Sequence, residues 1–93
     1  MKIKEGFILK EIAGENVVVP VGENLVDFGA MIVLNQTGVF LWKLLQEDKT
    51  ESQLLQSVLS EYDVDQQSAK QDIREFIDAL IEKDLVVSDN DKA

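Results

Sequence analysis

The stretch VLNQTGVFLWKLL, residues 33–45, changes from a strand-like to a helix-like pattern within a few residues. Its start continues the apolar run MIVLN, residues 31–35, which is typical of a strand. From Phe40 onwards the apolar residues recur three and four apart, as on one face of a helix. Asn35 or Thr37 can cap this helix, because either side chain can accept a hydrogen bond from a free first-turn amide. The stretch therefore predicts a junction where a strand ends and a helix begins.

Two more strands are predicted upstream of this junction. FILKEI, residues 7–12, and the β-branched run NVVVPV, residues 16–21, flank a turn at Gly14 and predict a hairpin. Pro20 cannot donate to a strand ladder, so we expect it near the end of its strand or at a bulge. A longer connection, residues 22–30, leads to the third strand.

Two more helices are predicted downstream. Thr50 and Gln53 form the pattern of a capping box before an apolar stripe that ends at Tyr62. Asp65 is the expected cap of a third helix that ends at about Lys83. The stripe of the third helix comprises Ala69, Ile73, Phe76, Ile77, Leu80 and Ile81. Residues 85–87 are expected to dock as a short extended piece, and the polar residues 88–93 to be a disordered tail.

This order of elements predicts an α+β fold that is winged-helix-like, with a three-stranded antiparallel sheet followed by a three-helix unit. The length of 93 residues fits one small domain, which we place at residues 1–87.

The composition excludes several classes of chemistry. The chain has no cysteine and no histidine, which removes disulfides, thiolate zinc sites and Cys or His nucleophiles. The acidic stretch from Asp63 to Asp72 lacks the glycine that a calcium loop needs. We therefore expect no catalytic residues, no metal and no cofactor. No segment resembles a signal peptide or a membrane helix, so the expected location is cytoplasmic, with no membrane partner.

The net charge of −9 argues against a nucleic-acid partner. A winged-helix fold nevertheless invites the alternative of a transcription regulator that binds DNA or a protein partner. In that case the third helix would enter the major groove. Residues 65–83 carry three basic and five acidic residues, a net charge of −2, which is the wrong sign for that role.

The third strand has features of a peptide-binding edge. Residues 30–35, AMIVLN, contain no charge and no proline, the usual devices that discourage pairing at a sheet edge. An extended peptide could therefore add to this edge as one more strand. Alternatively, the edge is covered by residues 22–30, by the tail or by a second copy of the chain in a homodimer.

Several segments in a fixed order resemble the PqqD family, whose domains are also called RiPP recognition elements. The resembling segments are VVVPVGEN (residues 17–24), LNQTG (34–38), LWKLL (41–45), TESQL (50–54), EYDVD (61–65), DIREFIDAL (72–80) and LV (85–86). The resemblance covers roughly residues 7–87 and implies three strands followed by three helices. The connection at residues 21–30 is longer than in compact members of the family, and could form an extra strand, cover the groove or support a dimer.

The resemblance also implies a function. Such domains are not catalysts: they hold the leader part of a ribosomally made precursor peptide as an added strand between the third strand and the third helix. They present it to a separate modifying enzyme, often a radical SAM protein. The residues expected to bind the peptide are Met31, Ile32, Val33 and Leu34 on the strand, and Ala69, Asp72, Ile73, Glu75, Phe76 and Ala79 on the helix. The net charge predicts a leader with basic residues.

Overall fold

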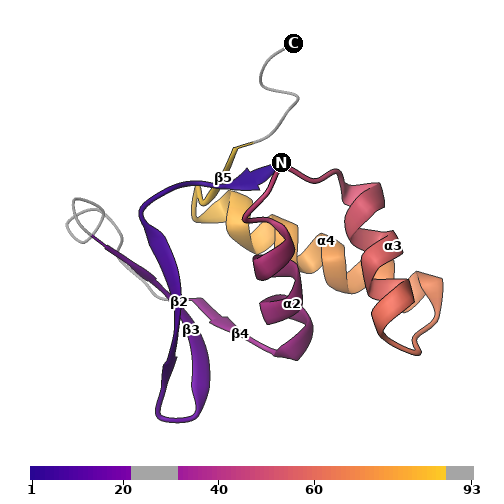
Figure 1. Ribbon diagram of the computed structural model, residues 1–93, viewed down its shortest axis with the longest axis horizontal. Helices are drawn as coiled ribbons and strands as arrows, with labels where there is room; N and C mark the ends of the chain where they lie inside the picture. Colours follow the sequence, from indigo (N-terminus) through magenta and orange to yellow (C-terminus); the bar gives the residue numbers. More distant parts are fainter. Residues whose placement is uncertain (22–31, 88–93) are drawn as a thin grey trace.

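The computed structural model describes residues 1–21 and 32–87 and has the predicted α+β fold. Its antiparallel sheet has the strand order β2-β3-β4. The three strands are β2 (Phe7–Ile12), β3 (Glu15–Pro20) and β4 (Ile32–Leu34). Three helices follow the sheet and lie to one side of it (Figure 1).

The three helices are α2 (Gln36–Leu44), α3 (Glu51–Glu61) and α4 (Gln66–Glu82). α3 and α4 begin at the predicted caps, and α2 begins at Asn35, one of its two candidate caps. Thr50 and Gln53 form both bonds of the capping box, and the Asp65 carboxylate accepts from the backbone N–H of Ser68 at 3.2 Å. Hydrogen bonds from Ser68, first its side chain and then its backbone, lower the pKa of Asp65. Local hydrogen bonds between side chains and backbone N–H groups thus determine where these helices begin.

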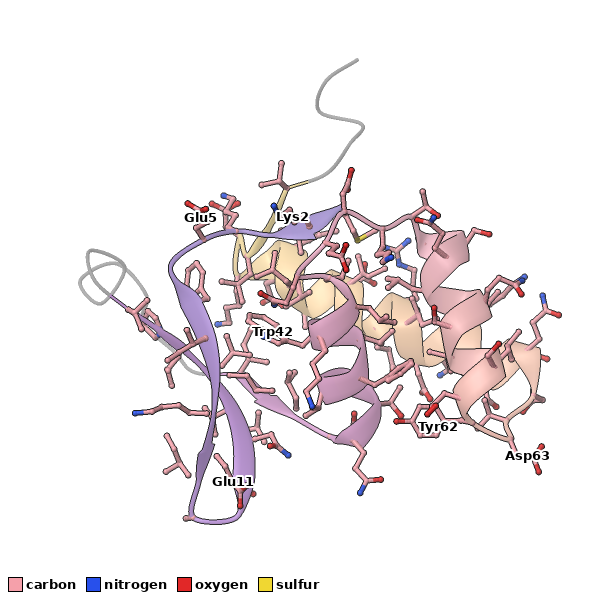
Figure 2. All side chains as sticks on the ribbon, viewed as in Figure 1. Lys2, Glu5, Glu11, Trp42, Tyr62 and Asp63 are labelled. Carbon is pink, nitrogen blue, oxygen red and sulfur yellow. The ribbon has the colours of Figure 1, made fainter. Side chains whose placement is uncertain are left out.

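The core lies between the helices and the inner face of the sheet, whose side chains are shown in Figure 2. Its fully buried side chains are Leu41 and Leu45 of the α2 segment, Leu54 of α3, Ile73, Ile77 and Leu80 of α4, Val18 of β3, and Leu85. Trp42 belongs to the same cluster. Ile81 is the exception to the predicted stripe of α4, since 56% of it is exposed.

A second, two-stranded sheet joins the two ends of the described chain. β1 (Lys2–Ile3) pairs with β5 (Val86–Val87) in antiparallel register. The backbone N–H of Ile3 donates to the carbonyl of Leu45 at 2.9 Å, and that of Lys4 to the carbonyl of Leu85 at 2.8 Å. The sequence predicts that residues 85–87 dock, but β1, their partner, is too short to show periodicity.

Pro20 ends β3, as expected, and pairs with Phe7 of β2. The expectations for residues 22–30, for Met31 and for the tail at 88–93 lie outside the described residues. None of the described helices has the length and apolar character needed to cross a membrane.

Replacement of Leu85 tests whether the junction between the two ends contributes to the core. Leu85 is fully buried, so Leu85→Ala should lower the free energy of unfolding by about 2–5 kcal/mol. Val87→Ala is the matched control, because Val87 is 45% exposed and should change stability by less than about 0.5 kcal/mol. Urea unfolding followed by Trp42 fluorescence measures both, and equal losses would contradict this account.

Candidate functional site

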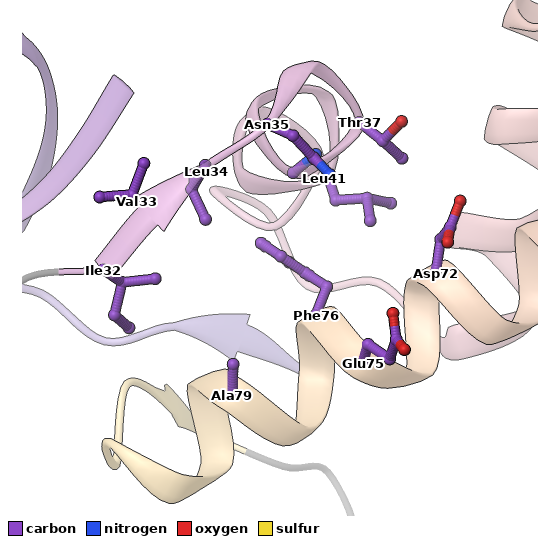
Figure 3. A pocket seen from close by; sticks show the side chains of 11 residues that line it. Ile32, Val33, Leu34, Asn35, Thr37, Leu41, Asp72, Glu75, Phe76 and Ala79 are labelled. Carbon is purple, nitrogen blue, oxygen red and sulfur yellow. The ribbon is translucent and has the colours of Figure 1, made fainter. Parts of the chain in front are cut away.

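A groove of about 190 Å³ separates β4 from α4 (Figure 3). Its residues come from β4, from the α2 segment that directly follows β4, and from α4, which comes only after α3 in the chain. They are Ile32, Val33 and Leu34 of β4, Asn35, Thr37, Gly38 and Leu41 of the α2 segment, and Asp72, Glu75, Phe76 and Ala79 of α4. The fold therefore creates a site that no single segment contains.

One wall of the groove is a sheet edge. Within the described residues, β4 pairs with β3 alone, so its other edge has no strand partner. Ile32 and Leu34 point towards α4, whereas Val33 points the other way (Figure 3) and is 59% exposed. A strand edge of this kind presents free backbone N–H and C=O groups to an extended chain.

The junction between β4 and α2 holds this edge in place. The Asn35 side-chain oxygen accepts from the backbone N–H of Gly38 at 2.8 Å, which caps α2 directly after β4 ends. A Cβ at Gly38 would lie 3.2 Å from Leu34 Cβ and 3.3 Å from Asn35 Oδ1. Glycine thus allows the first turn of α2 to pack closely against the end of β4.

The opposite wall of the groove is formed by α4. Its apolar lining residues, Phe76 and Ala79, lie along the groove, and its acidic lining residues, Asp72 and Glu75, form the rim at one end. Phe76 extends from α4 towards Leu34, while Asp72 and Glu75 lie towards the Thr37 end and Ala79 lies towards the Ile32 end (Figure 3). No lysine or arginine is among the described residues that line this groove. The site can therefore accommodate apolar side chains along its length and favours a positive charge at one end.

The two carboxylates of the rim have no ion-pair partner among residues 1–21 and 32–87. Among the described residues, neither Asp72 nor Glu75 has a basic group within 4.0 Å. Arg74, which lies between them in sequence, instead reaches Glu51 of α3 and Asp78 on its own helix, both at 3.2 Å. Within the part of the chain that the structure describes, no contacting cation thus cancels the negative potential at this end of the groove.

Seven of the ten residues predicted to bind a peptide line the groove: Ile32, Val33, Leu34, Asp72, Glu75, Phe76 and Ala79. Met31 lies outside the described residues. Ala69 and Ile73 do not line this groove, since each is only 1% exposed and packs in the core. The family resemblance implies both as peptide-binding residues, but they belong to the apolar stripe of α4 that packs in the core.

Sequence reasoning missed four groove residues, Asn35, Thr37, Gly38 and Leu41. The sequence indicates Asn35 and Thr37 as candidate caps where the strand ends, and Leu41 as part of a helical face, but none of them as a residue that lines the groove. Their position directly after the edge strand is the signal that could have placed them at the groove, because a helix that follows an edge strand without a linker must begin beside it.

A second hollow, of about 680 Å³, lies between α3 and α4. It contains the basic residues Lys70 and Arg74, but Arg74 is bonded there to Glu51. This hollow has no strand edge, because all its described residues belong to the two helices. It therefore lacks the backbone groups that make the β4 groove suited to an extended ligand.

The family model of coenzyme PQQ synthesis protein D (PqqD) matches residues 15–86. The chain belongs to the PqqD family. The match includes all the described residues of the groove and all three helices. No curated protein matches the chain.

Two solved structures resemble this PqqD-family chain over nearly its whole length. "TbiB1 in Complex with the TbiA(beta) Leader Peptide" is 30% identical, with a TM-score of 0.70, over 91% of this chain and 93% of that one. "Lasso peptide synthetase B1 complexed with the leader peptide" is 20% identical, with a TM-score of 0.68, over 94% of this chain and 96% of that one. The second likeness concerns the fold alone.

Replacement of Asn35 tests the cap at the strand–helix junction. Asn35→Ala removes the oxygen that accepts from Gly38 and should lower the free energy of unfolding by about 1 kcal/mol. Asn35→Asp retains an acceptor and places a negative charge at a helix N-terminus, so it should stay within about 0.5 kcal/mol of the parent. Urea unfolding measures both variants, and a loss of equal size in both would show that the cap bond is not what Asn35 contributes.

Proposed function

We propose that this protein binds the leader segment of a ribosomally made precursor peptide and presents it to a separate modifying enzyme. The leader adds to the free edge of β4 as one more strand and lies in the groove between β4 and α4. The observation that carries this proposal is the edge of β4, unpaired within the described residues, beside a groove lined by α4. Membership of the PqqD family and the likeness to a leader-peptide complex support it.

The physical basis of binding is backbone pairing combined with apolar burial. An added strand would exchange hydrogen bonds with β4, and its alternate side chains would contact the floor formed by Leu34, Leu41 and Phe76. The groove is formed in the free protein, because the Asn35 cap and the core fix β4 and α4 independently of a ligand. A preformed groove lowers the ordering cost of binding.

The partner that carries out the chemistry is proposed to be a separate enzyme, such as a radical SAM protein. The chain contains no cysteine that could ligate an iron–sulfur cluster, and no cysteine or histidine that could serve as a nucleophile or as its imidazole base. Holding the peptide as a strand leaves the remainder of the precursor outside the groove, where an enzyme can reach it. The place of action is proposed to be the cytoplasm, where precursor peptides are made.

DNA binding is the competing function, and α4 argues against it. Its two basic residues, Lys70 and Arg74, line the hollow next to α3, and Arg74 is paired with two carboxylates. A recognition helix would instead present unpaired cations to the phosphates. A duplex DNA titration is therefore the appropriate negative control in the experiment below.

A charge placed inside the groove should abolish binding. Ala79→Glu would add a carboxylate at the Ile32 end, where an added strand would bury it. We expect at least about tenfold weaker binding, because an unpaired buried charge costs more than the roughly 1.4 kcal/mol that tenfold represents. The measurement is fluorescence anisotropy with the labelled leader segment of a short peptide encoded beside this gene.

Ile81→Glu is the matched control for Ala79→Glu. It makes the same change in net charge on the same helix, but at a position that is 56% exposed and outside the groove. It should change the affinity by less than about twofold, since surface charges act weakly at a distance. Equal weakening by both variants, or saturable binding of duplex DNA in place of the peptide, would refute the proposed function.

A further inference from the structure

The two sides of α4 differ in charge. Lys70 and Arg74 belong to the side next to α3, whereas Asp72 and Glu75 line the groove beside β4. The arginine is neutralised by Glu51 and Asp78, but the two groove carboxylates have no such partner among the described residues. The helix thus presents uncompensated negative charge to the groove and to one end of it only.

The register of β4 determines which side chains of an added strand would face this charge. Side chains directly opposite each other in neighbouring strands lie on the same face of a sheet. Residues opposite Ile32 and Leu34 would therefore point towards α4, and the residue opposite Val33 would point away from it. Because the alternation has a period of two, the next inward residue beyond Leu34 would lie at the Asn35 and Thr37 end.

The peptide side chains that would point towards α4 meet different surroundings at the two ends of the groove. Opposite Ile32 and Leu34 the surroundings are Ala79, Phe76 and Leu41, which favour apolar side chains. Beyond Leu34 the surroundings are Asp72 and Glu75 together with the polar Asn35 and Thr37. A lysine or arginine there would meet carboxylates and amide or hydroxyl oxygens, all of which accept hydrogen bonds.

We infer that the β4–α4 groove selects leader segments with two apolar residues in alternate positions and a lysine or arginine two residues beyond them, at the Asp72 end. This inference rests on the proposed function and specifies its substrate class. The residues between these three positions face away from α4 and are free to vary. The direction of the bound peptide decides whether the cation precedes or follows the apolar pair.

A display selection from random peptides tests this pattern directly. Phage-displayed random 14-residue peptides are selected on the immobilised protein and on its Asp72→Asn/Glu75→Gln variant. Asp63→Asn/Glu82→Gln is the matched control, because it also removes two negative charges from exposed positions that do not line the groove. Ala79→Glu serves as the blocked groove.

The parent and the matched control should both enrich the apolar pair with a basic residue two positions beyond it. Asp72→Asn/Glu75→Gln should keep the apolar pair and lose the basic residue. For the best selected peptide, exchange of its cation for glutamine should weaken binding to the parent about three- to tenfold, as expected for two partly exposed ion pairs. The same exchange should have less than about a twofold effect on Asp72→Asn/Glu75→Gln.

The outcomes separate the two proposals. Enrichment of the apolar pair without a cation, or equal enrichment of cations by the parent and by Asp72→Asn/Glu75→Gln, overturns the inference and leaves the proposed function standing. If the parent retains no peptide better than Ala79→Glu does, the proposed function fails and the inference fails with it.

Discussion

The hydrogen bond from the Gly38 amide to the Asn35 side chain is the interaction on which the arrangement of the site depends. It spans 2.8 Å and begins α2 at the residue after the cap, with no linker behind β4. A helix that starts there without a Cβ at Gly38 can pack against Leu34. The edge strand is thereby attached to the helical unit, and α4, which packs with α2, becomes the second wall of the groove.

The rest of the fold supports this arrangement from both sides. β3 fixes β4 by pairing along its inner edge, and the outer edge stays free within the described residues. β1 and β5 bring the start of the chain against the end of α4, so that Leu85 and Ile3 close the core near its last turn. The groove thus lies between elements that strand pairing and core packing hold together, and a groove formed before its ligand arrives lowers the ordering cost of binding.

The sequence predicts those features that depend on local chemistry. The three helix caps and the hairpin follow from side-chain type and from periods of two and of about 3.6 residues. The facing of Ile32 and Leu34 does not, because residues 31–34 are all apolar and show no alternation. The rotation of α4 about its axis does not follow, because its apolar stripe is wide enough to serve two neighbours. Ala69 and Ile73, which the family resemblance implies as peptide-binding, therefore lie in the core, and Ile81 of the same stripe is exposed. The pairing of β1 with β5 joins residues about 85 positions apart, and no local pattern encodes it.

The central claim is that a peptide adds to β4 as a strand, and isotope-filtered nuclear Overhauser spectroscopy tests it most directly. The sample combines labelled protein with the unlabelled leader segment of a short peptide encoded beside this gene. We predict backbone-to-backbone contacts between the peptide and Ile32, Val33 and Leu34, together with side-chain contacts to Phe76 and Ala79. Peptide contacts confined to the hollow between α3 and α4, or side-chain contacts without any to the backbone of β4, would contradict the account.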